Sequence, residues 1–436
     1  MSTPDPRHLR PAPIHRLTAP VRRFLHIEAA SGAVLLACAV VALVVANSPL
    51  GHGFHQFWQT PLGVTLNGWE LVKPLEWWVN DGLMTVFFFV VGLEIKRELA
   101  VGELNSPRKA ALPVVAAVGG MVVPAGVYLL FGHAGAATRG WGIPMATDIA
   151  FVVGVMAAFG NRVPFGLKIF LLSLAIADDM GAVLVIALAY TEQLNLTMLA
   201  LAGGGFVLTV ALNLLGARPV PIYALVGAAT WLATYKSGIH PTVAGVVLGL
   251  LTPYRAWIEL PTLRDALQTL LGRAEDGSAE PRDLRRMEFA AREAVPPLQR
   301  LEHLLHPWVG FVIMPVFALA NAGVVVDPAV VTDRVSLAVA AGLLVGKPVG
   351  IVLFAWLAVR LKLAVLPTGV TWRLMLAAGL LGGIGFTMSL FVGGLAFPDH
   401  AELLAAAKTG ILLGSGLAAA LGAAVLAVSA RKREGE

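Results

Sequence analysis

The sequence predicts an all-α polytopic membrane protein of about twelve transmembrane helices. Hydrophobic residues make up 57% of the 436 positions and charged residues only 14%, whereas an average soluble domain is roughly 45–50% apolar. The mean hydropathy is +0.77. Windows of about 20 mostly apolar residues, the length that crosses a bilayer, recur near residues 29–47, 79–97, 112–132, 142–160, 166–190, 196–215, 220–235, 239–252, 306–326, 335–359, 374–397 and 402–428.

Basic residues orient these spans, because cytoplasmic loops carry an excess of Lys and Arg. With both termini in the cytoplasm, 26 of the 32 Lys and Arg residues fall on the cytoplasmic side, four fall outside and two lie within spans. The net charge of +5 is spread over loops, which argues against a nucleic-acid-binding face. We therefore expect a cytoplasmic arm at 1–28 and a cytoplasmic tail at 429–436. The apolar run at 29–46 is longer than the core of a signal peptide and predicts a retained first span.

Two loops divide the membrane portion. Residues 51–74 contain short β-prone runs and an Asn-Gly turn signal at 67–68, so they predict an outside β-hairpin within the region of spans one to eight, residues 29–254. Residues 255–300 are charged and predict a flexible cytoplasmic linker. Spans nine to twelve follow at 301–428.

A pair of carboxylates interrupts the fifth span. Asp178 and Asp179 lie in the middle of residues 166–190, which are otherwise apolar enough to cross a bilayer. Burying one carboxylate at the centre of a membrane helix costs roughly 2.5–3.5 kcal/mol, so the pair predicts an ion or proton site. Lys347 lies centrally in the tenth span. We expect it to be a buried counter-ion of Asp178, Asp179 or Asp148, rather than a lysine that reaches an interface.

Two other spans contain signals for interrupted helices. The fourth span places Pro144, Thr147 and Asp148 near mid-membrane, and the eleventh contains the glycine-rich string 379–387. Proline removes a backbone donor, and non-helical backbone is tolerated in a membrane where it lines a cavity. The glycines alone would equally suit close helix packing. Because the two interruptions occupy the middle of three-span groups, they predict the binding site of a transporter.

A third group of titratable residues lies near the cytoplasmic ends of spans. Glu302, His303 and His306 open the ninth span, and Glu94 lies at the inner end of the second. Glu and His at this spacing could bind a metal ion, but adjacent residues diverge on a helix. Histidine titrates near neutrality, so we favour a pH-responsive cluster.

These segments together resemble the NhaA-type sodium/proton antiporters over about residues 24–428. The resemblance implies a two-domain helical fold with an inverted-repeat core, and a homodimer assisted by an extracellular β-hairpin in a bacterial inner membrane. It implies pH-regulated exchange of cytoplasmic sodium or lithium for external protons, without a cofactor or enzymatic activity. Six strings in order carry it: 90–99, 146–151, 175–181, 301–308, 346–348 and 382–388.

The resemblance also assigns roles by motif. Asp178 and Asp179 match the family's ion- and proton-binding pair, with sodium held at these two carboxylates, and Lys347 matches the lysine that pairs with it. The remaining matches are Thr147 and Asp148 at the broken-helix crossing, and Glu94, Glu302, His303 and His306 in pH response. The chain departs from the family in its long 255–300 linker and in the proline that follows His240, whose role stays open.

Two other classes of membrane protein are alternatives. An intramembrane aspartyl protease needs aspartates on different, facing spans, and the sequence has no Gly-x-Gly-Asp string. A sodium-coupled symporter of an organic solute is the nearer alternative. Exchange is favoured because a proton and a small hard cation would compete for the same buried carboxylates.

Overall fold

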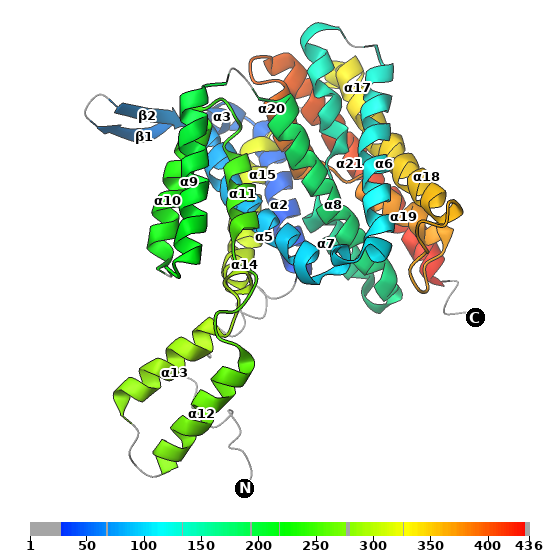
Figure 1. Cartoon of the computed structure of the whole chain (residues 1–436). Coiled ribbons are helices and arrows are strands. Elements are labelled where there is room, and N and C mark those ends of the chain that lie inside the picture. Colours follow the sequence, from blue (N-terminus) through cyan, green and yellow to red (C-terminus); the bar gives the residue numbers. More distant parts are fainter. Residues whose placement is uncertain are drawn as a thin grey trace.

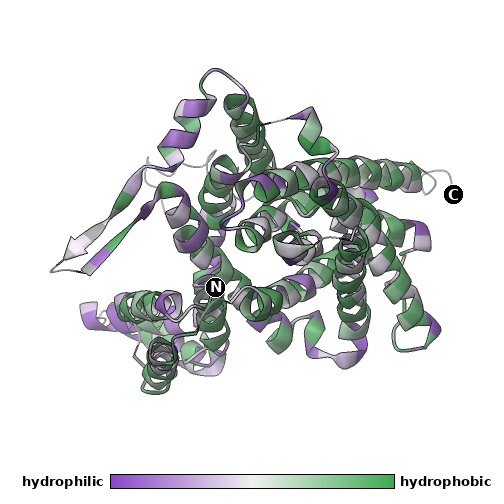
Figure 2. Ribbon diagram, turned by 90° about the horizontal axis from the view of Figure 1, so that it is seen from above, coloured by the Kyte–Doolittle hydropathy of each residue, from purple (hydrophilic) through white to green (hydrophobic). Residues whose placement is uncertain are grey.

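The computed structural model describes residues 28–66, 69–132, 134–191, 194–217, 219–275, 280–325 and 327–431. Its helices form one bundle (Figure 1). A two-stranded hairpin projects from one end, and two helices extend from the opposite end. Figure 2 shows hydrophobic residues over most of the length of the bundle helices, as expected for a membrane protein.

The elements follow one another in two halves. The first half contains α2 (Glu28–Ala46), α3 (Gly51–Trp58), β1 (Pro61–Leu66), β2 (Trp69–Pro74), α4 (Leu75–Trp77), η2 (Trp78–Leu83), α5 (Met84–Val101), η3 (Glu103–Asn105), α6 (Pro107–Leu130), η4 (Gly135–Met145), α7 (Ile149–Phe159), η5 (Gly160–Arg162), α8 (Phe165–Ala189), α9 (Leu196–Leu214), α10 (Val220–Lys236) and α11 (Thr242–Leu251). The second half contains α12 (Leu260–Glu275), α13 (Pro281–Glu293), α14 (Pro297–Trp308), η6 (Val309–Ile313), α15 (Met314–Asn321), α16 (Pro328–Val331), α17 (Arg334–Ala341), η7 (Gly342–Gly346), α18 (Lys347–Arg360), α19 (Trp372–Gly382), α20 (Phe386–Ala396) and α21 (Ala401–Arg431).

The helices confirm a multi-pass membrane protein. In the described part of the chain, eight helices are long and apolar enough to cross a bilayer, or up to ten if each of two bent helix pairs is one span. One bent pair is α19 with α20, which meet at 46°. The count of twelve spans stays a prediction, since the expected span at 239–252 corresponds to α11, which has only 10 residues.

The predicted β-hairpin is confirmed, with a later start. The strands β1 and β2 pair antiparallel from Pro61↔Pro74 to Leu66↔Trp69. Residues 51–58, expected within the hairpin, form α3 instead. Its Phe54 and Trp58 are one helical turn apart and pack against the core, a spacing that suits a helix rather than a strand. The indole of Trp78 donates a hydrogen bond to the Leu62 carbonyl at 2.8 Å and ties the hairpin to the bundle.

The expected flexible linker at 255–300 contains two helices. The helices α12 and α13 pack against each other and extend from the bundle (Figure 1). An ion pair of 3.0 Å joins Arg273 to Asp283, and the Asp283 carboxylate accepts the backbone N–H of Glu280 at the start of α13. The base of the pair is fixed by the buried Glu293, which lies 3.3 Å from Arg300. The high content of charged residues predicts irregular structure for this segment, but in the structure these charged side chains form helix caps and ion pairs.

Three spans of the described chain contain π-helical turns, in which one extra residue is accommodated. These are η2 before α5, η6 before α15 and η7 before α18. The turn η7 ends at Gly346, so the next residue, Lys347, begins α18. This turn therefore sets the direction in which the buried lysine points.

Two interruptions of helical structure meet inside the bundle. Residues 146–148 are extended between η4 and α7, and residues 383–385 separate α19 from α20. The backbone N–H of Asp148 donates to the Ile384 carbonyl at 2.7 Å, which joins the two interruptions directly. The helices α6, α8, α18 and α21 pack around them. The candidate site lies at this meeting point.

Candidate functional site

The two aspartates of α8 are buried. Asp178 is 2% exposed and Asp179 is 3% exposed, on a 25-residue helix whose other residues are mostly apolar. The carboxylate oxygen Oδ2 of Asp178 lies 2.7 Å from Lys347 Nζ and accepts the Thr147 hydroxyl at 2.6 Å. The contact expected between Lys347 and Asp178 is therefore present. The lysine is 1% exposed, so this is a fully desolvated ion pair.

The other oxygens of the pair accept no hydrogen bond from the described residues. Among the described residues, Oδ1 of Asp178 is buried and has no hydrogen-bond partner. The Asp179 carboxylate also accepts no hydrogen bond from the described part of the chain. A buried carboxylate without a partner carries a large desolvation cost, which a proton or a bound cation would remove.

The Asp148 side chain accepts backbone N–H groups at the starts of two helices. Its side chain accepts the backbone N–H groups of Phe151 at 3.3 Å and Thr387 at 3.1 Å, and also the Thr387 hydroxyl. Phe151 lies in the first turn of α7 and Thr387 in the first turn of α20, where backbone N–H groups lack partners within the helix. A carboxylate is favoured at such positions by the helix dipole. Asp148 thus caps the starts of both α7 and α20.

Thr147 and Lys347 contact the carbonyl ends of the interrupted helices. The Thr147 hydroxyl lies 3.1 Å from the Gly382 carbonyl at the end of α19. The Lys347 ammonium donates to the Met145 carbonyl at the end of η4. A cation is favoured at these ends because their carbonyls lack helical donors. The interrupted helices thus present positive ends to Asp148 and a negative end to Lys347.

Three of the four predicted pH-responsive residues lie together where α5 packs against α14. Glu94 Oε1 is 3.9 Å from His306 Nδ1. Glu302 forms an ion pair with Arg97. His303 is exposed, and the described residues give it no ion pair. Sequence reasoning missed Arg97, although it lies in the string 90–99.

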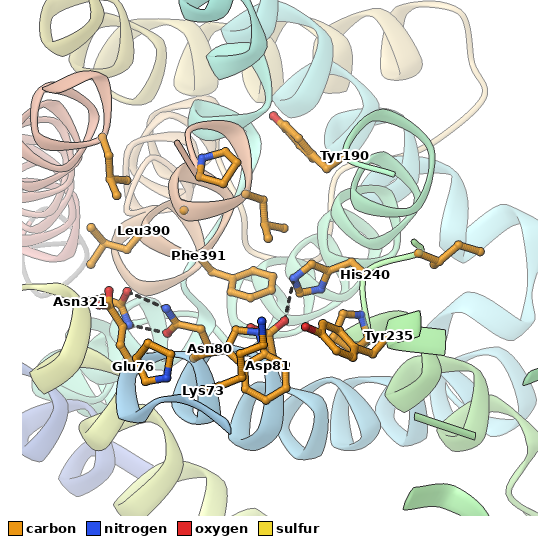
Figure 3. A pocket seen from close by; sticks show the side chains of 18 of the residues that line it. Lys73, Glu76, Asn80, Asp81, Tyr190, Tyr235, His240, Asn321, Leu390 and Phe391 are labelled. Atoms are coloured by element: carbon orange, nitrogen blue, oxygen red, sulfur yellow. Dashed lines mark hydrogen bonds and ion pairs between the residues drawn. The ribbon is translucent and has the colours of Figure 1, made fainter. Parts of the chain in front are cut away.

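A cavity of about 550 Å³ opens near the hairpin end of the bundle. Figure 3 shows Asn80 and Asn321 joined by a reciprocal amide contact, at 2.7 and 3.3 Å, and His240 turned towards Asp81. The His240 Nε2 atom lies 3.2 Å from Asp81 Oδ1, and its Nδ1 lies 2.8 Å from the Thr242 hydroxyl at the start of α11. Sequence reasoning left the role of His240 open, and it did not identify the two asparagines or Asp81.

The comparisons with known proteins cover nearly the whole chain. Residues 22–426 match the family described as Na+/H+ antiporter 1. A relative from Acidiphilium cryptum, called Na(+)/H(+) antiporter NhaA 2, is 47% identical over 98% of this chain and 95% of its own length. A Na(+)/H(+) antiporter NhaA from Rhizobium meliloti is 49% identical over 94% of both chains. One from Rhodopirellula baltica is 48% identical over 95% of both.

The buried pair generates a stability prediction. We expect Lys347→Ala to lower the free energy of unfolding by about 3–5 kcal/mol, because it leaves the Asp178 charge buried without its partner. Adding Asp178→Asn should restore most of that loss. A double-mutant cycle of unfolding in mild detergent measures the coupling.

The matched control is the exposed pair of Lys109 and Glu103, which are 3.4 Å apart. Lys109→Ala should cost under about 1 kcal/mol. If the losses of Lys347→Ala and Asp178→Asn simply add, the two side chains do not stabilise each other.

Proposed function

This chain belongs to the Na+/H+ antiporter 1 family and exchanges sodium for protons, and we propose that the exchange runs through Asp178 and Asp179. In this proposal cytoplasmic Na+ or Li+ leaves in return for external protons. The observation that carries it is a buried carboxylate pair in which one member is joined to Lys347, while the other has no ion pair or hydrogen bond with the described residues. The two carboxylates then act as one hard oxygen site that either ion can neutralise.

The steps follow from charge balance at the site. With no cation bound, the Lys347 ammonium neutralises Asp178, and a proton neutralises Asp179. A Na+ ion that reaches the pair brings one positive charge, so the proton on Asp179 must leave as the ion enters, while the Lys347 ammonium keeps its charge and is displaced from Asp178. Lys347 retains the Met145 carbonyl as a partner when it moves away from Asp178. Access from only one side of the membrane at a time makes this competition an exchange.

We further propose twelve spans in which the fourth and eleventh are broken and cross. The extended residues 146–148, the 46° bend between α19 and α20, and the bond from Asp148 N to Ile384 support the crossing. The charge asymmetry of the loops supports cytoplasmic termini in the inner membrane. The hairpin would then lie outside, and its free strand edges suit a homodimer contact.

The first prediction of this function concerns the carboxylates. We expect Asp179→Asn, and separately Asp178→Asn, to abolish Na+-dependent proton release, because an amide keeps the shape but cannot exchange a charge. Proteoliposomes with an imposed pH gradient and no organic solute provide the measurement. They also separate exchange from solute symport, which would need the solute.

The control for these variants is Asp399→Asn, since Asp399 is exposed and lies before α21. It should retain wild-type exchange. Turnover near the wild-type rate in both Asp178→Asn and Asp179→Asn would exclude the assigned site.

The second prediction concerns pH response. We expect His306→Gln to move the midpoint of the pH–activity profile by about half a pH unit, because it removes a titratable partner of Glu94. The maximal rate should stay close to wild type, since the site aspartates are unchanged. His303→Gln is the matched variant on the same helix, and it should move the profile less. A loss of rate with an unmoved profile for His306→Gln would contradict a role in pH response.

The third prediction tests topology and dimerisation together. In a Cys38→Ala background, Thr65→Cys on β1 should react with an impermeant thiol reagent added outside, and it should cross-link two protomers. Thr262→Cys on α12 should react only from the cytoplasmic side. Both positions are exposed. Reaction of Thr262→Cys from outside would reverse the orientation, and monomers after oxidation of Thr65→Cys would place the dimer contact elsewhere.

A further inference from the structure

The start of α20 is capped by a side chain from another helix. Ser415 of α21 lies with its hydroxyl oxygen 3.2 Å from the backbone N of Gly385 and 3.1 Å from that of Phe386, and it accepts both N–H groups. Ser415 is only 4% exposed. These two N–H groups precede the first helical bond of α20, so Ser415 supplies what a local N-cap residue usually provides.

Close packing explains why the cap comes from a distance. The local N-cap residue is Gly385. A Cβ at this position would lie 2.9 Å from the Leu343 side chain and 3.0 Å from the Ala146 carbonyl oxygen. A Ser, Asp or Asn therefore does not fit at 385, although these residues are the usual caps. Gly414, which precedes Ser415, has no Cβ, and a Cβ there would lie only 3.0 Å from Ala340 of α17. This glycine therefore allows α21 to pack closely against α17.

Ser415 and Asp148 accept different backbone N–H groups at the start of α20. Ser415 accepts the N–H groups of residues 385 and 386, and Asp148 accepts that of Thr387. Asp148 is held in turn by its own N–H, which donates to Ile384. The neighbouring Thr147 contacts Asp178 at 2.6 Å. These hydrogen bonds, joined by the short backbone segments 384–387 and 147–148, thus connect α21 to the buried carboxylate.

We propose that Ser415 is a positioning residue for the ion site. Its hydroxyl fixes the start of α20, so that Asp148 need not also satisfy the first two N–H groups and Thr147 stays in contact with Asp178. The inference rests on the exchange function proposed above. It assigns Ser415 to the binding of the cation rather than to the rate of transport.

The test measures Na+-dependent proton release in proteoliposomes as a function of Na+ concentration. We expect Ser415→Ala to raise the KM for Na+ about tenfold, the factor that corresponds to the loss of one hydrogen bond to a buried group. The maximal rate per folded transporter should stay within about threefold of wild type. Ser415→Thr keeps the hydroxyl and should bring the KM back towards the wild-type value.

The matched control is Ser336→Ala on α17. Ser336 is fully buried, and its hydroxyl has no hydrogen-bond partner among the described residues. This variant removes the same atom from a similar environment, so it should leave the KM unchanged. If Ser415→Ala does not fold, Ser415→Cys replaces it, because sulfur is a weaker acceptor.

Two results would overturn the inference: an unchanged KM in Ser415→Ala, or a Thr variant with the KM of the Ala variant. An unchanged KM together with a lower melting temperature would mean that Ser415 only stabilises the fold. A wild-type protein without Na+-dependent proton release would instead refute the exchange route proposed above.

Discussion

The structure depends on the cost of placing charges in an apolar bundle, and each buried charge has a different compensation. Lys347 is held by Asp178 and by a helix-end carbonyl. Asp148 is held by the starts of two helices. Asp179 is the exception, since it is 3% exposed and has no hydrogen-bond partner in the described residues. A proton or a cation at Asp179 would remove this remaining desolvation cost.

The two interruptions form one unit. Asp148 donates its N–H to the break before α20 and accepts an N–H from the first turn of the same helix. The Ser389 hydroxyl of α20 also donates to the Ile143 carbonyl of η4 at 2.8 Å. Neither interrupted helix can shift far without breaking bonds to the other. Movement of the site is thus coupled to movement of both helices, which suits a transporter in which two repeats share one binding site.

Sequence reasoning singled out the charged residues of the candidate site because ionisable residues within membrane spans are rare. Asp178, Lys347 and Asp148 each stand out in an apolar run, and their contacts follow from the need to compensate charge. Ser415 and Asn321 could not be found in this way, since a hydroxyl or amide in a membrane helix more often bonds its own backbone. The helices at 260–293 were missed because they contain many charges, and their stabilising contacts lie between residues on different helices.

The π-helical turns change the relation between the spacing of residues in the sequence and the directions of their side chains around the helix. Each residue of an α-helix turns the next by about 100°, so one extra residue moves every later side chain to a different face. A helical wheel drawn straight through residues 342–346 would therefore misplace Lys347 and the side chains that follow it. Residues on either side of η7 that are four apart in sequence do not share a face as they would in an uninterrupted helix. When probes are placed on this span for distance measurements, their directions should therefore be worked out separately for the residues before and after the turn.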